Sequence, residues 1–521
     1  MNINSKILFL FCFIGVFLFA NENLYTYKSL ESKSEVLIPL LLKKGEFINA
    51  KYKASAEINS FDILDENKKI VKKLYKFERL DNSFYFISNK TQKYFFKLIT
   101  GKKKISFTFE VLKKIETSVN KSEKNTFLSK IISSQNRELH KNKDTTSFWK
   151  MVKEKGTPLI EHIKNDDYIV TFLYKGAKNN VRLLGGPISD HVELDRLQDS
   201  DIWYKSFRVQ RGIRMSYQLA PDVPNINGSK REKRMAILAT LQADEFNKTP
   251  YEFAKKQFLD KYSMFSTFEI KKNNLKDWGK EEGSKKGKVL DYEIFSKILK
   301  NKRRISIYKP DSFNEKKEHD ILFIFDGKDY QIKVPTPLIL DNLIASKKIK
   351  PTVAIFIDNP SGKARASELP SNKSFANFMA KELLPFVKSK ININHKANNT
   401  ILTGSSYGGL ASTFVAFTYP EIFGKVLSQS GSFWWSPKDE EPEWLTRQIA
   451  KNKVKNIKFY LNAGKYETGY FSIDILESNR HLRTVLNSKN YKVFYEEFLT
   501  GHDYYSWKVN LARGLIKLSK F

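Results

Sequence analysis

The sequence has little cysteine, few long apolar runs and little acidic charge, and the first two shortages each exclude a class of protein. Cys12 is the only cysteine among 521 residues, which excludes a disulfide framework and a zinc site built from several cysteines. Only one long apolar run is present, so the chain is not a polytopic membrane protein. Asp and Glu number 57 against 90 Lys and Arg, which leaves a formal net charge of +33. That excess fits a nucleic-acid binder, a partner of an anionic surface, an enzyme of an anionic small substrate, or simply a Lys- and Asn-rich composition.

The one long apolar run lies at the N-terminus and predicts export. Lys6 precedes the apolar residues 7–19, and Ala20 is followed by polar residues. A short basic segment, an apolar run of this length and a small residue are typical of a cleavable signal peptide over residues 1–20. An uncleaved anchor is the alternative, but the run is short for a membrane span. We therefore expect no stable membrane insertion after cleavage, and export argues against nucleic acid as the partner.

The pattern of apolar residues changes along the chain and predicts three folded domains. Residues 21–116 and 146–272 carry short runs in which apolar and polar residues alternate, which is typical of β-sandwich-like domains. In residues 290–521, strand-like runs alternate with helical stretches, which indicates a mostly parallel, doubly wound sheet with helices on both faces. The polar segments 117–145 and 273–289 are expected to be linkers, the first with a helical portion.

A nucleophile elbow lies in the last of these domains. The strand-like run 400–403 leads into Gly404-Ser405-Ser406-Tyr407-Gly408, and an apolar helix follows. This is the G-x-S-x-G pattern of an α/β-hydrolase in its strand–turn–helix context. The two glycines leave room where strand and helix come close, and the turn presents the serine hydroxyl above the sheet edge. Ser406 is the predicted nucleophile; the alternatives are Ser405 and an ordinary glycine-rich turn.

The general base and its orienting acid must follow the serine in this fold. Only two histidines do so, His481 in a helical stretch and His502 on a loop near the C-terminus, and we predict His502 as the base. Glu467 follows the strand-like run 459–464 and is the predicted acid. Asp474 and a Ser–His dyad without a strong acid are the alternatives.

Backbone amides are expected to hold the oxyanion. One is the amide of Tyr407, next to the nucleophile, and the second comes from Gly327 or Lys328 in the loop Asp326-Gly327-Lys328. A simple turn is the alternative for this Asp-Gly pair.

These residues resemble those of the enterochelin (enterobactin) esterase family. The matches in the last domain include 322–327, 404–410, 428–435 and 501–503, and those in the second β-rich domain include 148–149, 156–158, 170–174 and 201–204. The resemblance covers roughly residues 146–521. The family's Asp-Pro-Leu-Asn string is present only as Asp244-Glu245-Phe246-Asn247, and Gly-Gly-His-Asp only as Thr500-Gly501-His502-Asp503.

The resemblance implies an α/β-hydrolase that opens the trilactone of a catecholate siderophore, with or without ferric iron bound. Ser406 would attack an ester carbonyl, His502 would take the serine proton, and water would release the acyl-enzyme. No cofactor is implied, because iron would arrive with the substrate. The signal peptide and the leading sandwich resemble those of the periplasmic members, which implies a periplasmic location.

Three further side chains are candidate substrate contacts. Arg365 is the candidate partner of an anionic catecholate, and an ion pair with Glu368 is its alternative role. Trp434 and Trp435 are candidates for stacking on the substrate, and core packing is their alternative.

Two other functions are compatible with the sequence. One is a secreted carboxylesterase acting on phenolic or carbohydrate esters, of the feruloyl or acetyl type. The other is an inactive siderophore- or glycan-binding protein, against which the intact set of Ser406, Glu467 and His502 argues.

Overall fold

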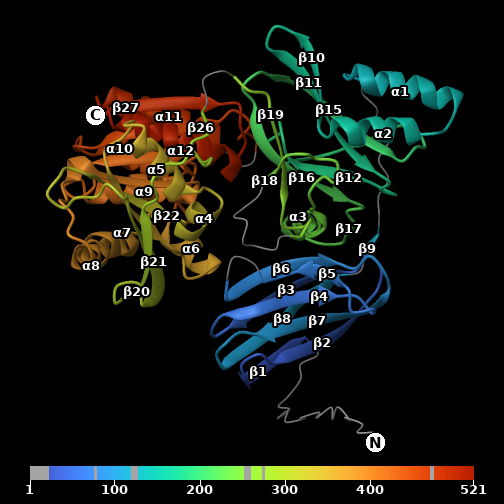
Figure 1. Ribbon diagram of the computed structural model, residues 1–521, viewed down its shortest axis with the longest axis horizontal. Helices are drawn as coiled ribbons and strands as arrows, with labels where there is room; N and C mark the ends of the chain where they lie inside the picture. Colours follow the sequence, from blue (N-terminus) through green and yellow to red (C-terminus); the bar gives the residue numbers. More distant parts are fainter. Residues whose placement is uncertain are drawn as a thin grey trace, which may run out of the picture. The chain divides into compact units, whose positions relative to one another are not determined.

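The computed structural model describes residues 23–75, 79–115, 117–118, 127–251, 260–272, 276–469 and 474–521 (Figure 1). The predicted signal peptide lies outside these residues. Among the helices of the described ranges, none is long and apolar enough to cross a membrane. The chain divides into two compact units, one up to Thr117 and one from Ser118.

The first unit is a β-sandwich. One sheet has the order β1 (Leu24–Leu30), β8 (Ile105–Ile115), β3 (Phe47–Ala54) and β6 (Asp81–Ile87), and the other has the order β2 (Glu35–Leu42), β7 (Gln92–Thr100), β4 (Ile58–Leu64) and β5 (Ile70–Lys73). Successive side chains of a strand point to opposite faces, so the alternating apolar residues of both sheets form one core. At its centre the ring of Phe61 lies 5.1 Å from that of Tyr52 and 5.2 Å from that of Phe107. The short strand β9 (Thr117–Ser118) lies at the boundary between the two units along the chain.

The second unit begins with a β-rich domain. Its first sheet contains β10 (Leu159–Lys164), β11 (Asp167–Lys175), β15 (Ile202–Gln210) and β14 (Asp195–Arg196), and its second contains β13 (His191–Glu193), β12 (Val181–Gly185), β16 (Arg214–Pro221), β19 (Phe265–Glu269) and β18 (Pro250–Tyr251). The remaining elements are α1 (Lys130–Lys141), α2 (Thr146–Lys155), α3 (Lys230–Thr240) and β17 (Asn225–Ile226). Helix α1 is the helical portion expected in segment 117–145, and its Ile132 and Leu139 are buried against Phe148 and Trp149 of α2.

The α/β-hydrolase domain is built on one eight-stranded sheet, in the order β20, β21, β23, β22, β24, β25, β26 and β27. The first two strands, β20 (Lys288–Ser296) and β21 (Asn301–Lys309), are antiparallel. The others pair in parallel, as the alternation of strands and helices predicts: β22 (Asp320–Phe325), β23 (Thr352–Ile357), β24 (Thr400–Ser405), β25 (Lys425–Gln429), β26 (Lys458–Gly464) and β27 (Lys492–Phe498).

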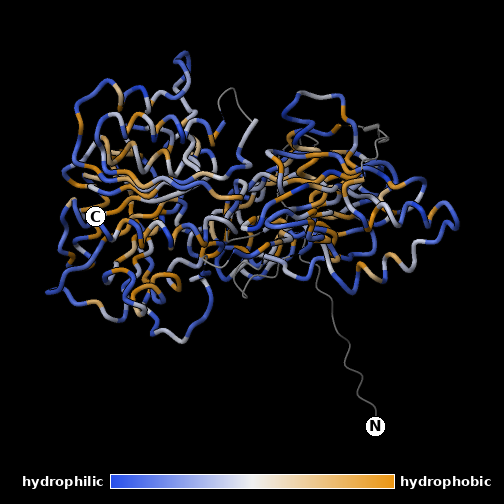
Figure 2. Tube along the Cα trace, turned by 90° about the horizontal axis from the view of Figure 1, so that it is seen from above, coloured by the Kyte–Doolittle hydropathy of each residue, from blue (hydrophilic) through white to orange (hydrophobic). Residues whose placement is uncertain are grey.

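Helices cover both faces of this sheet, which is why its central strands are buried along their whole length. One face packs against α7 (Lys373–Phe378), a π-helical turn (Met379–Leu383), α8 (Leu384–Lys390), α9 (Tyr407–Thr418), α10 (Trp444–Lys451) and α11 (Ile475–Ser488). The other packs against α4 (Gly327–Ile332), α5 (Thr336–Ala345) and α12 (Tyr504–Leu518). The short helix α6 (Gly362–Glu368) and a 3-10 turn (Ala397–Asn399) complete the domain. Figure 2 shows the apolar strands of this sheet between helices whose outward residues are hydrophilic.

The topology determines where catalytic side chains can meet. Parallel strands end at the same edge of a sheet, and the loops after β24, β26 and β27 carry Ser406, Glu467 and His502. Ligands of open α/β sheets bind at this edge.

Candidate active site

Ser406 occupies the sharp turn between β24 and α9. Its backbone has φ 57° and ψ −120°, a strained conformation for a residue with a side chain. A Cβ atom on Gly404 would lie 2.8 Å from the backbone of Gly408, so only glycine lets strand and helix approach this closely. Ser405, the alternative nucleophile, is buried and does not line the neighbouring cavity, whereas Ser406 does. The local geometry is thus the one that the elbow pattern predicts.

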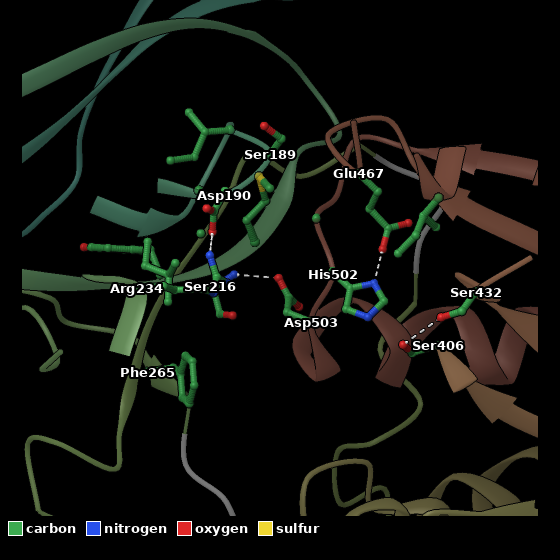
Figure 3. Close-up of a pocket in the computed structure, with 18 of the residues that line it drawn as sticks. Ser189, Asp190, Ser216, Arg234, Phe265, Ser406, Ser432, Glu467, His502 and Asp503 are labelled. Atoms are coloured by element: carbon green, nitrogen blue, oxygen red, sulfur yellow. Dashed lines mark hydrogen bonds and ion pairs between the residues drawn. The ribbon is translucent and has the colours of Figure 1, made fainter. Parts of the chain in front are cut away.

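A second hydroxyl lies against the predicted nucleophile. Oγ of Ser432 is 3.2 Å from Oγ of Ser406, and the Ser432 amide donates to the Ser406 carbonyl at 3.1 Å (Figure 3). Ser432 is buried and lines the cavity. The sequence reasoning missed it, although it belongs to the Ser-Gly-Ser-Phe-Trp-Trp string that contributes to the family resemblance. A hydroxyl at this distance can fix the rotamer of the serine or donate to a group bound there.

His502 and Glu467 form a short hydrogen-bonded pair. Nδ1 of His502 lies 2.6 Å from Oε1 of Glu467, and the other carboxylate oxygen accepts the Gly464 N–H at 2.6 Å. The Glu467 side chain is 1% exposed, so its carboxylate is held by these two donors. A carboxylate accepts only, so Nδ1 carries the proton and Nε2 is left as the basic nitrogen. Figure 3 shows the ring lying between Glu467 and Ser406.

The structure therefore brings together the three side chains predicted as nucleophile, base and acid. The ring of Trp507 meets that of His502 edge-on at 4.8 Å between centroids and buttresses it. Their catalytic roles remain a prediction that substitution can test.

The alternative acid and base are engaged elsewhere. Asp474 caps α11, where Oδ1 accepts the Glu477 N–H at 2.7 Å. His481 lies on the same helix and pairs with Glu443. Neither Asp474 nor His481 lines the cavity beside Ser406.

Of the two predicted sources of oxyanion donors, one lines the cavity and the other does not. Tyr407 is the first residue of α9, so its N–H has no acceptor within the helix, and it lines the cavity. Gly327 and Lys328 do not line the cavity. The Lys328 N–H donates to the carboxylate of Asp358, and Gly327 packs against the backbone of Ile357 in β23. The Asp-Gly loop packs against this neighbouring strand, and the second oxyanion donor stays a prediction.

Arg365 lines the cavity and is anchored by a buried carboxylate. Its Nε and Nη2 donate to the two oxygens of Asp326 at 2.6 and 2.8 Å. Burial alone would lower the pKa of Arg365, but the Asp326 charge raises it, so the guanidinium stays charged. The alternative ion pair with Glu368 is wrong, because Glu368 pairs with Arg303 at 2.8 Å.

The two neighbouring tryptophans have different surroundings. Trp434 lines the cavity, with its ring 6.2 Å from that of Tyr407. Trp435 is partly buried against the hydrolase core and is not among the cavity residues. Core packing is therefore what the structure shows for Trp435, and only Trp434 is placed to contact a ligand.

The cavity beside Ser406 has a volume of about 490 Å³ and two walls. One wall comes from the hydrolase domain and the other from the β-rich domain, and both domains belong to the second unit. The β-rich wall includes the ion pair of Arg234 with Asp190 (Figure 3). The ring of His191 also contacts Asp190, at 2.9 Å. Phe265 adds an aromatic ring to this wall. The sequence reasoning missed these residues because no motif or spacing connects them to the elbow.

The described ranges contain no group of three or more His, Cys, Asp or Glu side chains placed to hold a metal ion. The lining carries two arginines, Arg234 and Arg365, and each is paired with a carboxylate.

Comparisons with known proteins agree with this arrangement. The family model "Enterochelin esterase, N-terminal" matches residues 169–266, and the model "Putative esterase" matches residues 296–518. The iron(III) enterobactin esterase of Dickeya dadantii is 26% identical over 405 residues, which are 71% of this chain and 91% of that protein. The chain is thus similar to enterochelin esterases over both its β-rich domain and its hydrolase domain.

Other relatives match over part or all of this region. The iron(III) enterobactin esterase of Escherichia coli O6:H1 is 32% identical over 226 residues, 43% of this chain and 55% of the relative. Among solved structures, the ferric enterobactin esterase of Salmonella typhimurium has a TM-score of 0.61 and 24% identity, covering 72% of this chain and 98% of its own. The Shigella flexneri enterobactin esterase, solved in the presence of enterobactin, has a TM-score of 0.59 and 24% identity, with coverages of 72% and 98%. The protein is thus an ester hydrolase with an α/β-hydrolase fold behind a β-rich domain.

Proposed function

We propose that the protein hydrolyses the ester bonds of catecholate siderophore trilactones of the enterobactin type. The observation that carries the proposal is the position of Ser406, which opens into a cavity shared by the hydrolase domain and the domain of the enterochelin esterase type. The names of the relatives support it, as do Shigella flexneri structures obtained in the presence of enterobactin and of 2,3-dihydroxy-N-benzoyl-serine.

The mechanism follows from the hydrogen bonds of the triad. Glu467 holds the Nδ1 proton of His502, so Nε2 takes the proton of Ser406 as its Oγ attacks an ester carbonyl. The amide of Tyr407, at the positive end of α9, stabilises the oxyanion. His502 then gives the proton to the departing seryl oxygen. Water, deprotonated by the same nitrogen, releases the acyl group and regenerates Ser406.

Repetition of this cycle converts the ring into a linear trimer and then into dimer and monomer. Iron is part of the substrate in this scheme, and cutting the ring weakens its chelation.

The cavity offers the groups that a catecholate requires. Arg365 and Arg234 present cationic groups, and Trp434 and Phe265 present aromatic faces. Small-molecule sites are typically of a few hundred Å³ with apolar walls and few polar groups, and this cavity has that character.

The deciding experiment is incubation of the purified protein with apo and ferric trilactone, with products followed by chromatography. We expect ordered appearance of linear trimer, dimer and monomer. Ser406→Ala should abolish hydrolysis, and Ser405→Ala is the matched control on the neighbouring, buried hydroxyl. If the wild type leaves the trilactone intact and cleaves feruloyl or acetyl esters, the carboxylesterase alternative replaces this proposal.

Export to the periplasm is the second part of the proposal. It is supported by Lys6, the apolar run 7–19 and Ala20. Cell fractionation should find the protein in the periplasm with an N-terminus at Asn21, and a cytoplasmic chain that retains residues 1–20 would refute it.

A further inference from the structure

We infer that the β-rich domain positions the general base, because strand β16 holds the loop that carries His502. The inference rests on the catalytic role of His502 in the proposed function, and it assigns that domain a part in catalysis beyond forming a wall of the cavity. Arg214, Ser216 and Asp503 are the positioning residues.

Backbone groups of β16 hold the loop on both sides of His502. Ahead of the histidine, the Arg214 N–H donates to the carbonyl of Leu499 at 3.2 Å. Behind it, the Ser216 N–H donates to the carboxylate of Asp503 at 3.1 Å, as Figure 3 shows. The hydroxyl of Ser506 returns a bond to the Arg214 carbonyl at 3.1 Å. His502 therefore sits between two anchors that belong to the other domain.

The Arg214 side chain adds a third anchor. Its Nε donates to the carbonyl of Tyr505 at 3.1 Å, and its guanidinium lies 3.7 Å from the centre of the Tyr505 ring. The buried charge is balanced by Glu269 at 2.7 Å and by Asp277 at 3.3 Å. Only arginine combines a planar face for stacking with several donors in fixed directions, so lysine cannot reproduce the whole set.

Asp503 links the loop to two elements at once. One oxygen accepts from Ser216, and the other accepts the Ser506 N–H at 2.8 Å and so caps α12. Burial raises the pKa of Asp503, and the bonds from Ser216 and Ser506 oppose that rise. Next to the histidine, Gly501 touches this strand too, because a Cβ atom there would lie 2.9 Å from Cε of Met215.

The hydrolase domain holds the loop from the other side. The Tyr466 N–H donates to the carbonyl of Thr500 at 3.2 Å, and Glu467 holds Nδ1 of the ring. These contacts orient the imidazole, whereas the β16 anchors set the height of the loop above Ser406. A shift of about 1 Å in a catalytic group can cost about a hundredfold in rate, so loss of an anchor should act on the chemical step.

The test uses the full chain with a small chromogenic ester and a fluorophosphonate that labels the active serine. Both probes need Ser406 and His502 but not the siderophore, so failure on the trilactone would refute the proposed substrate and leave this inference standing. We expect Asp503→Asn and Arg214→Gln to lower kcat about tenfold to a hundredfold. KM should stay within about twofold and the labelling rate should fall in parallel with kcat, because both report the same positioned base.

The controls separate positioning from general destabilisation. Arg214→Lys keeps the positive charge and should recover part of the kcat that Arg214→Gln loses. The recovery should be partial, because lysine has no planar guanidinium to stack on a ring and to donate in several directions. Ser206→Ala removes a buried 2.8 Å hydrogen bond to Thr171 inside the β-rich domain and should leave kcat unchanged. If Arg214→Gln or Asp503→Asn does not fold, Ser506→Ala, which removes the hydroxyl that bonds to the Arg214 carbonyl and to the Asp503 carboxylate, should still lower kcat severalfold. A folded Asp503→Asn variant with the kcat and the labelling rate of the wild type would overturn the inference. If only Ser506→Ala folds, the same result in that variant would overturn it.

Discussion

Replacing Glu467 with glutamine tests the assigned acid, because the change removes a charge and keeps the shape of the side chain. One oxygen of Glu467 accepts the Gly464 N–H at 2.6 Å and the other accepts from Nδ1 of His502 at 2.6 Å. A backbone N–H only donates, so the single oxygen of glutamine must stay on Gly464 and its NH2 group must face Nδ1. The imidazole then accepts at Nδ1 and carries its proton on Nε2, which is the wrong tautomer for a base.

The expected loss follows from the tautomer. In a serine protease triad, the equivalent change lowers kcat about 10⁴-fold, and we expect a fall of roughly 10³- to 10⁴-fold here. At about 1.4 kcal/mol for each factor of ten, this is roughly 4–5.5 kcal/mol of transition-state stabilisation. The assay is kcat on a small chromogenic ester, with thermal unfolding to show that the variant is folded.

Asp474→Asn is the matched control. Asparagine caps a helix as well as aspartate does, so this variant should keep kcat within about twofold. A folded Glu467→Gln enzyme with more than a tenth of the wild-type kcat would refute the reasoning, and so would an Asp474→Asn enzyme as damaged as the Glu467 variant.

Three further predictions follow from other contacts. Glu368→Gln leaves the fully buried guanidinium of Arg303 without its counter-charge and should lower the free energy of unfolding in urea by about 3–5 kcal/mol; a loss below about 1 kcal/mol would contradict the burial of the pair. Burial raises the pKa of Asp244 to about 6, so its contribution to stability is complete below about pH 4 and is lost as the pH rises through 6. Chemical unfolding between pH 4 and 7 should therefore show the wild type losing roughly 3 kcal/mol relative to Asp244→Asn, and parallel pH profiles would refute the shift. Ser432→Ala removes the hydroxyl 3.2 Å from that of Ser406 and should lower kcat about fivefold, the equivalent of one neutral hydrogen bond of about 1 kcal/mol; an unchanged kcat would exclude a role for it.

The parts of the site that depend on local sequence could be predicted. The elbow around Ser406 is specified by glycines within a few residues, and the order of strands in the fold places Glu467 and His502 at the same edge. The alternation of strands and helices likewise predicts the parallel sheet, because the helices must cover both of its faces.

The parts that depend on packing between distant segments could not. The Lys328 amide bonds to Asp358, which follows a different strand, and the turn alone does not reveal this contact. Arg365 has Glu368 three residues away in sequence, yet it pairs with Asp326 across the sheet edge. Trp434 and Trp435 are adjacent, and only their depth in the fold separates a cavity residue from a core residue.

The β-rich wall of the cavity was the part of the site that the sequence was least able to predict. Arg234 and Asp190 line the same cavity as residues of the hydrolase domain only because the two domains pack together. No sequence pattern within either domain indicates that they share a cavity. The same holds for the anchors of the His502 loop on β16.

The central claim is that trilactone hydrolysis proceeds through an ester on Ser406, and trapping that intermediate tests it most directly. The protein is mixed with the trilactone, quenched in acid within the first turnover and digested for mass spectrometry. The account predicts a dihydroxybenzoyl-serine acyl group on the peptide that contains Ser406, and no such adduct in Ser406→Ala. Turnover of the trilactone by the Ser406→Ala variant at the wild-type rate, without an adduct on this peptide, would contradict it.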